Sequence, residues 1–285
     1  MRYVVALWLL LILQSLALAQ SDVVHYLAPE TDSDPRQVYP LQLLRLALNK
    51  VDPQIQLKAS PFQMTQSRAL TELIDDNVID VVWSATSQTR EHIWLPVRIP
   101  IYKGLLGYRV FLYKPDTLTQ TPSELSVEQL KQIPMIQGHD WPDTEILQAN
   151  GFTTVSTANY DATFRMLNQQ PERLYPRSVT EVWNEWQMHR HQGIEIEATL
   201  MLHYTMPQYF FVSKNNPELQ QLIEKGLRKA IADGSFDETF NRYLREKVAP
   251  LQLEQRRIIE LNNPIIPDIL PTTASELWHQ IPGKR

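Results

Sequence analysis

Apolar runs and helical repeats alternate along the first third of the chain. Short β-rich runs stand at 23–27, 55–58 and 78–83, and apolar residues recur at helical spacing over 40–51 and 65–74. Strands that alternate with helices are typical of a parallel sheet covered by helices. The pattern therefore predicts an α/β lobe at the start of the chain.

The same alternation returns after a connecting segment. An apolar run at 108–113 is expected to cross into a second lobe, and one at 207–214 to cross back, with hinges near Tyr108 and Phe210. Between them we expect helices at 126–131, 143–150, 160–168 and 179–188, and strands at 135–136, 154–156 and 173–175. Helices at 217–232 and 236–244 then follow.

These elements predict the domain organisation of the chain. It consists of a signal peptide at 1–19, a first lobe at 20–107 and 209–250, a second lobe at 108–208, and a C-terminal tail at 251–285. The segment 262–285 at the end of the tail contains four prolines. We therefore expect this segment to run extended over the surface, anchored by Trp278.

The first residues predict export. A charged start, an apolar stretch and the small-x-small sequence Ala17-Leu18-Ala19 form a secretory signal peptide that is cleaved before Gln20. No later segment approaches the ~20 apolar residues of a membrane span. The chain has no cysteine, which argues against a lipoprotein anchor, disulfides and thiolate metal sites. We therefore expect a periplasmic protein that is neither membrane-inserted nor a lipoprotein.

Charge and motifs exclude several function classes. The net charge of −5 is spread without long runs of one sign, which argues against nucleic acid as a partner. The chain has no Gly-rich phosphate loop, and the histidines at 189 and 191 lack a third ligand. We expect no cofactor and no metal, and we expect a monomer that binds a small-molecule ligand.

The candidate chemistry of the first lobe follows the strand that ends near Trp83. Ser84, Thr86 and Arg90 give hydroxyls and then an arginine, which can hold a small anion in the crevice where open α/β sheets bind ligands. Tyr26 and Trp83 could form aromatic walls of that crevice. Alternatively, the hydroxyls cap the next helix, Arg90 lies on the surface and the aromatic residues belong to the core.

The order of these elements resembles the type II periplasmic solute-binding proteins, in their amino-acid-binding branch, over residues 22–244. The family pattern of an aspartate, hydroxyls, an arginine and a proline before the crossing strand is matched by Asp80, Ser84, Thr86, Arg90 and Pro100. The resemblance implies an α/β fold of two lobes joined by two crossing strands. It also implies that Arg90 binds the α-carboxylate of the ligand.

The last short strand of the second lobe departs from that family. Amino-acid-binding members carry an aspartate there that pairs with the ligand's ammonium, whereas this chain has Arg177 followed by Ser178. If Arg90 and Arg177 both face the cleft, the ligand should carry two separated negative groups. Alternatively, Arg177 forms a structural pair with Glu181 on the next helical turn.

A second departure is the turn at 137–141, which replaces the usual Gly-Thr anion turn of the family. In this turn Asp140 could replace the missing ammonium partner or could cap the following helix. Trp141 could form a wall of the cleft or pack in the core.

Three functions remain open at this point. The sequence favours a binding protein that captures a small anionic or zwitterionic solute, amino-acid-like or a dicarboxylate, for an ABC permease or a membrane sensor. A second hypothesis is a dehydratase-like enzyme on the same fold, with Glu181 or Asp140 as general acid. A third is a ligand-free periplasmic interaction protein, whose cleft stays open or is filled by its own side chains.

Overall fold

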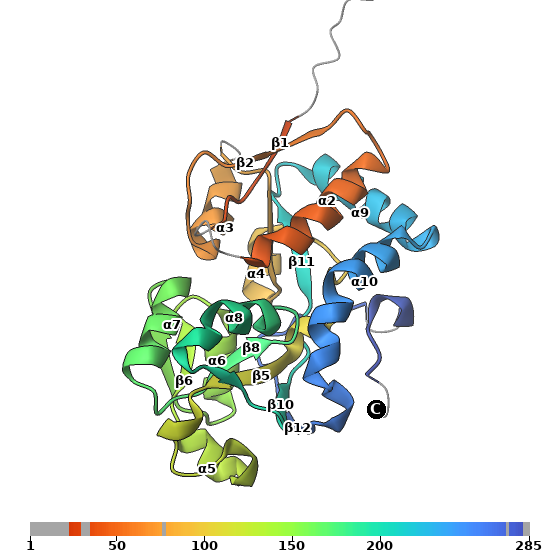
Figure 1. Cartoon of the computed structure of the whole chain (residues 1–285). Helices are drawn as coiled ribbons and strands as arrows, with labels where there is room; N and C mark the ends of the chain where they lie inside the picture. The colour runs from red at the N-terminus through yellow and green to blue at the C-terminus, as the bar shows by residue number, and fades with distance from the viewer. Residues whose placement is uncertain (1–22, 30–34, 76–77, 272–273, 282–285) are drawn as a thin grey trace, which may run out of the picture.

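The structure is a computed structural model that describes residues 23–29, 35–75, 78–271 and 274–281. The predicted signal peptide, 1–19, lies outside these residues. The chain forms two α/β lobes, each with its own sheet. Figure 1 shows the first lobe in red and orange together with the cyan and blue segments from late in the chain, and the second lobe in yellow and green.

The first lobe is built on a five-stranded sheet with the order β2-β1-β3-β11-β4. β1 pairs in parallel with β2 and β3, whereas β11 runs antiparallel to β3 and β4. All five residues of β3 and of β11 are buried, as expected for the central strands of a covered sheet. The strands are β1 (Val23–Tyr26), β2 (Gln56–Ala59), β3 (Val81–Ala85), β4 (Leu95–Val97) and β11 (Gln208–Val212).

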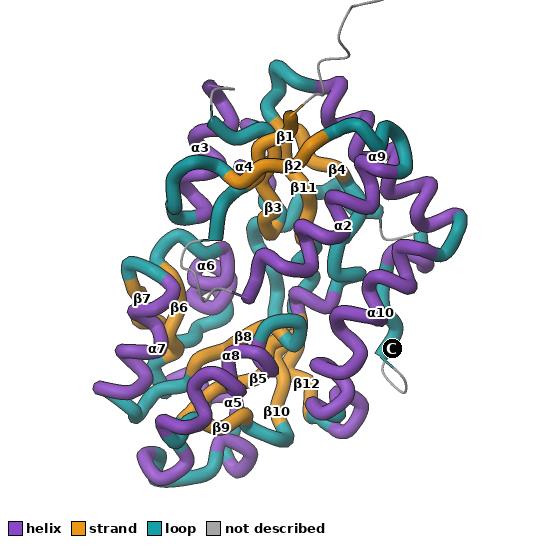
Figure 2. Tube along the Cα trace, turned by 45° about the horizontal axis from the view of Figure 1, so that its top comes forward, coloured by secondary structure: helices purple, strands orange, loops and turns teal. Residues whose placement is uncertain are grey.

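The helices of the first lobe come from both ends of the chain. α2 packs against α9 and α10, which follow β11 in sequence (Figures 1 and 2). Their apolar stripes bury Leu43, Leu44, Ile223 and Leu227 completely, each worth about 1.5–3 kcal/mol of hydrophobic transfer. The helices are α2 (Val38–Asn49), α3 (Gln66–Asp75), α4 (Gln88–Ile93), α9 (Pro217–Ala232) and α10 (Ser235–Val248).

The second lobe has a main sheet with the order β12-β10-β5-β8, to which β9 adds beside β5, and a smaller β6-β7 pair. Its strands are β5 (Tyr108–Tyr113), β6 (Met135–Gly138), β7 (Thr154–Thr157), β8 (Tyr175–Ser178), β9 (Glu195–Ile196), β10 (Leu200–His203) and β12 (Arg257–Glu260). Its helices are α5 (Val127–Gln132), α6 (Pro142–Ala149), α7 (Tyr160–Gln169) and α8 (Val182–His189).

The chain crosses between the lobes slightly earlier than the sequence predicts. Tyr108 already begins a strand of the second-lobe sheet, and Phe210 lies inside the first-lobe sheet, opposite Trp83. The crossings instead use the short 3₁₀ helix η2 (Leu105–Gly107) and the segment 204–207. They run side by side, because the Tyr204 amide donates to the Gly107 carbonyl at 3.2 Å. A Cβ on Gly107 would lie 2.0 Å from the Tyr204 carbonyl oxygen, so only glycine fits there.

The C-terminal tail contains a strand, β12, before the proline-rich segment that was expected to run extended. β12 pairs in parallel with β10, and the Asn263 side chain donates to the carbonyl of Thr205 in the crossing at 2.9 Å. The tail also contacts the first lobe, because the Ile265 carbonyl of the tail accepts a hydrogen bond of 2.9 Å from the backbone amide of Gln88.

The tail ends beside the other crossing. The His279 amide donates to the Lys103 carbonyl at 2.8 Å, and the Trp278 indole donates to the Pro271 carbonyl at 2.9 Å. The tail thus contacts both lobes and both crossings. Among the described residues, no helix combines the length and the apolar character that a membrane span requires.

Candidate functional site

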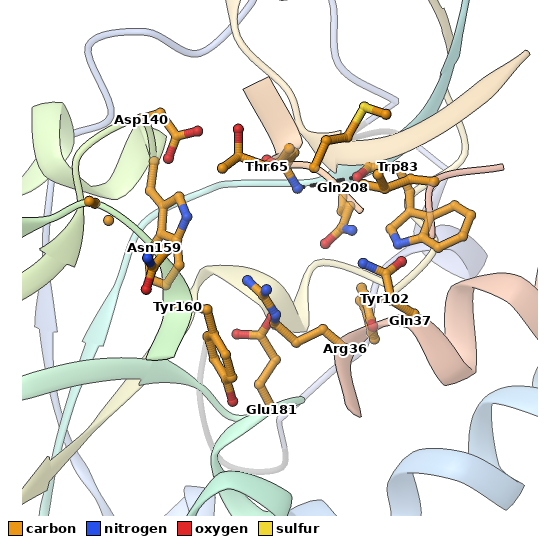
Figure 3. Close-up of a pocket in the computed structure, with 16 residues that line it drawn as sticks. Arg36, Gln37, Thr65, Trp83, Tyr102, Asp140, Asn159, Tyr160, Glu181 and Gln208 are labelled. Atoms are coloured by element: carbon orange, nitrogen blue, oxygen red, sulfur yellow. Dashed lines mark hydrogen bonds between the residues drawn. The ribbon is translucent and has the colours of Figure 1, made fainter. Parts of the chain in front are cut away.

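Side chains of both lobes converge on one cleft, shown in Figure 3. Its empty volume is about 650 Å3, counting the mouth that opens to solvent. The first lobe contributes mainly amides and aromatic rings, whereas the second contributes carboxylates as well. The principal lining residues are Arg36, Gln37, Thr65, Gln66, Trp83, Tyr102 and Gln208 from the first lobe, and Gly138, Asp140, Trp141, Asn159, Tyr160 and Glu181 from the second.

Trp83 lies in the middle of β3 and lines the cleft wall, which is one of the two positions that the sequence left open for it. Its ring is stacked with that of Tyr26 at 6.2 Å between centroids and meets Phe210 edge-on at 6.1 Å. Tyr26 is not one of the residues that line the cleft. Tyr26 and Phe210 therefore fix the orientation of the Trp83 ring.

Arg90 lies behind the cleft wall. Its Nη1 donates to Ser84 Oγ and to the Ala85 carbonyl, both at 2.7 Å, and Ser84 Oγ donates to Oε1 of the lining residue Gln66 at 2.8 Å. Burial lowers the pKa of Arg90 to about 10, although the nearby charge of Asp140 opposes this shift. Arg90 is therefore still a cation at neutral pH, and it reaches the cleft through Ser84 and Gln66. Its role as a carboxylate clamp stays a prediction.

Thr86 also turns away from the cleft. Its hydroxyl donates to Glu91 Oε1 at 2.7 Å, while the hydroxyl of Ser87 caps α4 by accepting from the Arg90 amide at 3.2 Å. The strand-end hydroxyl that caps this helix is thus Ser87, one residue beyond Thr86.

Arg177 forms the floor of the cleft in a cluster of ion pairs. Its Nη2 lies 2.8 Å from Glu181 Oε2 and 2.7 Å from Glu185 Oε1, and its Nε donates to Glu185 Oε2 at 2.8 Å. The pair with Glu181 is the structural alternative that the sequence left open, and Glu185, which is fully buried, extends it. Ser178 is buried beside this cluster, where its hydroxyl accepts from the Thr180 amide at 3.2 Å.

A second buried pair completes the floor. Nη2 of Arg109 lies 2.8 Å from Asp143 Oδ1, and its Nε donates to the Tyr204 hydroxyl at 3.0 Å. Nη1 of Arg109 also lies 3.8 Å from Glu181. Buried charges of this kind are tolerated because each one has an opposite partner and hydrogen bonds.

Glu181 has an unusual electrostatic environment. Burial raises the pKa of its carboxyl, and Glu185 adds to this, while Arg177, Arg109 and Arg36 oppose it. Glu181 lines both the outer and the deeper part of the cleft. It is therefore an acidic group that the second lobe presents to both parts of the site.

Asp140 and Trp141 both line the cleft. Asp140 does not cap the following helix, whose N-cap is Trp141; instead Oδ2 accepts a hydrogen bond of 2.5 Å from Ser67 on the opposite lobe. The Trp141 ring folds flat over Gly138, where a Cβ would lie 2.5 Å from the indole. The glycine thus lets this ring lie along the cleft wall.

Comparisons with known proteins agree with this architecture. No family model and no curated sequence matches the chain. Solved structures do match. An amino acid ABC transporter substrate-binding protein from Streptococcus pneumoniae bound to L-arginine is 12% identical, with a TM-score of 0.60, covering 81% of this chain and 95% of that one. The protein has the fold of the two-lobed periplasmic binding proteins. Among the structures that match are proteins of the amino-acid-binding branch, as the sequence predicts.

Two further matches show how varied the proteins with this periplasmic-binding-protein fold are. A histidine kinase sensor domain with similarity to periplasmic binding proteins is 15% identical, with a TM-score of 0.56, covering 79% of this chain and 95% of that one. An ancestral amino-acid-binding protein, a precursor of cyclohexadienyl dehydratase, is 13% identical, with a TM-score of 0.57, covering 78% of this chain and 95% of that one. These similarities show the fold of the chain and leave its ligand open.

Sequence reasoning missed several residues of the cleft. Arg109 could have been found, because a charged residue inside the apolar run 108–113 needs a buried partner. No such local signal marks the other cleft residues that were missed, which are Arg36, Gln66, Tyr160 and Gln208. They meet only because this binding-protein fold brings helix and strand ends from both lobes to one place.

Proposed function

We propose that the protein is a receptor that binds a small, zwitterionic, amino-acid-like solute between its lobes. The observation that carries this proposal is that polar and aromatic side chains of both lobes face one cleft, which Ser67 and Asp140 bridge directly. A solute held by both lobes favours the closed arrangement, because it has more contacts there than in an open one.

Charge pairing supports a zwitterion over a dicarboxylate. Arg109 is paired with Asp143, and Arg177 with Glu181 and Glu185. A dianion would have to compete with these carboxylates for the arginines. A solute with one positive and one negative group preserves the balance of charge, and it can exchange hydrogen bonds with the uncharged amides in the wall.

The expected export signal and the fold support a periplasmic role. A solute-loaded, closed form is what an ABC permease or a membrane sensor would recognise. Proteins named for both roles, a transporter substrate-binding protein and a histidine kinase sensor domain, are among the structures with this fold.

A thermal-shift screen tests this function. The chain from Gln20 onward is unfolded, dialysed free of small molecules and refolded, and then mixed with single amino acids and with dicarboxylates. A bound amino acid at 100 times its Kd adds about 2.7 kcal/mol to the free energy of unfolding, and each kcal/mol raises Tm by roughly 2–4 °C in a chain of this size.

The rise in Tm that the solute causes should be smaller in the Asp140→Asn variant, because Asp140 lines the cleft. It should be unchanged in Asp116→Asn, which alters an exposed residue. If only dicarboxylates raise Tm, the ligand class is wrong. If no solute raises Tm, the interaction protein becomes the better hypothesis.

The environment of Glu181 favours a second candidate, an acid-catalysed elimination of water from a cyclic carboxylic acid. A carboxyl group with a raised pKa inside a cleft is suited to donate a proton to a leaving hydroxyl, which departs as water. The carboxylate that results takes up the proton that the neighbouring carbon loses as the double bond forms. The test is to incubate the protein with cyclic hydroxy acids and follow the ultraviolet absorbance of the unsaturated product. Turnover that is lost in Glu181→Gln would support the enzyme, and the absence of turnover with a substrate that binds would exclude it.

A further inference from the structure

One side chain of the first lobe reaches across the cleft into the second. The guanidinium carbon of Arg36 lies 4.2 Å from the centroid of the Tyr160 ring and 5.9 Å from that of Trp141. Figure 3 shows Arg36 extended toward Tyr160 and Glu181. Arg36 belongs to the 3₁₀ helix η1 (Pro35–Gln37), immediately before α2, so this contact joins the two lobes.

The second lobe presents a cage for a cation at this point. Two aromatic faces and a carboxylate within reach of one position are the groups that recognise guanidinium and alkylammonium ions. Tyr160 is held in place because its hydroxyl donates to Glu185 Oε1 at 3.1 Å and its ring packs edge-on against Phe164 at 5.4 Å. Trp141 is held over Gly138. The cage is thus formed by the second lobe alone.

We propose that Tyr160, Trp141 and Glu181 form a binding site for a guanidinium or alkylammonium group, and that Arg36 is its built-in competitor. This inference rests on the proposed solute-binding function and adds a rule of selectivity to it. A cationic group on a solute must displace Arg36 from the cage, whereas an uncharged group has no place there. Arg36 therefore weakens the binding of cationic side chains and favours solutes that leave the contact between the lobes intact.

Binding of two small probes to an Arg36→Ala variant tests the cage. Butylguanidinium carries the cation, and butylurea has the same shape without the charge. Calorimetry should show that Arg36→Ala binds butylguanidinium at least about tenfold more tightly than the native protein does, with no gain for butylurea. Arg45→Ala removes an exposed arginine from α2 and should bind both probes as the native protein does.

Two further variants keep the test decisive. Adding Tyr160→Leu to Arg36→Ala removes one face of the cage, so the gain in affinity for butylguanidinium should disappear. If Arg36→Ala does not fold, Arg36→Gln keeps most of the length and removes the charge, and it should show the same gain. No gain in either variant, or an equal gain for butylurea, would overturn the proposal.

The outcomes also separate this inference from the proposed function. If the native protein binds amino acids and Arg36→Ala gains nothing for butylguanidinium, the function stands and the competitor role of Arg36 is wrong. If no amino acid binds the native protein but butylguanidinium binds Arg36→Ala, the cage is correct and the proposed function is wrong.

Discussion

The two walls of the cleft are built in different ways. Apart from Arg36, the first lobe lines the cleft with uncharged groups such as Gln66, Trp83 and Gln208, and its buried Arg90 stands behind them. The second lobe brings its charges into the floor itself, where Arg177 is paired with carboxylates of its own lobe. The first lobe therefore offers hydrogen bonds to a solute, whereas the second offers a balanced set of charges.

The largest effect should come from breaking the pairs in the floor. Arg177→Ala leaves the buried Glu185 and Glu181 without their main partner, which costs roughly 3–5 kcal/mol of unfolding free energy. Urea denaturation followed by circular dichroism measures this loss. Arg165→Ala, an exposed arginine on α7, should change the unfolding free energy by less than about 0.5 kcal/mol. Similar losses in the two variants would show that the ion pairs contribute little to stability.

Arg90→Ala should have a smaller effect on stability, because it removes hydrogen bonds to Ser84 and Ala85 and leaves no carboxylate in direct contact unpaired. We expect a loss of about 1.5–3 kcal/mol. If Arg90 acts on the solute through Gln66, Gln66→Ala should weaken solute binding as much as Arg90→Ala does. If Arg90→Ala weakens binding about a hundredfold while Gln66→Ala does not, Arg90 contacts the ligand's carboxylate as the sequence predicts.

The Glu181 carboxyl should make the stability of the second lobe depend on pH. Its pKa is raised in the folded state, so it contributes most to stability below the ordinary pKa of a glutamate. That contribution is lost as the pH rises through the raised value. The difference in unfolding free energy between the native protein and Glu181→Gln should therefore shift in favour of the variant as the pH rises. A difference that stays constant with pH would show that Glu181 titrates normally.

The smallest effect should come from the bridge between the walls. Ser67→Ala removes one hydrogen bond to Asp140, which is worth about 1 kcal/mol, and should weaken solute binding by less than about tenfold without changing the fold. Calorimetry with the solute found in the screen measures this change. Thr119→Ala, an exposed hydroxyl on the second lobe, is the control. An unchanged affinity in Ser67→Ala would show that this bond does not help to hold the lobes together on the solute.

The sequence was sufficient for the fold because helices and strands alternate with clear apolar periods. Prediction from the sequence was less accurate where local signals compete. The strand expected at 173–175 lies instead at Tyr175–Ser178 and includes Pro176, which is tolerated because β8 is an edge strand of its sheet. β12 was not predicted as a strand, and its residues were counted with the tail. The short run Arg257–Glu260 becomes a strand only where it pairs with β10.

The site was harder to predict than the fold. Trp83, Asp140 and Trp141 were candidates for the cleft, with core packing or helix capping as alternatives, and all three line it; that they bind a ligand stays a prediction. Arg36 and Tyr160 meet through a contact between lobes, and no local pattern encodes such a contact. The paired state of Arg177 was one of two open alternatives, since the i,i+4 spacing to Glu181 does not reveal whether the pair faces solvent or a cleft.

The order of the strands in the first-lobe sheet also has a consequence for how the protein folds. β3 is buried between β1 and β11, yet β11 follows every strand of the second lobe except β12 in sequence, and the Gln88 side chain is bonded to Ile266, 178 positions away. Contacts between such distant segments form slowly because a long loop must close first. A chain that emerges N-terminus first therefore exposes the edge of the apolar β3 that pairs with β11 until the last third of the chain is available. The folding intermediate most prone to aggregation is thus one in which the second lobe is formed except for β12 and the first lobe is still open.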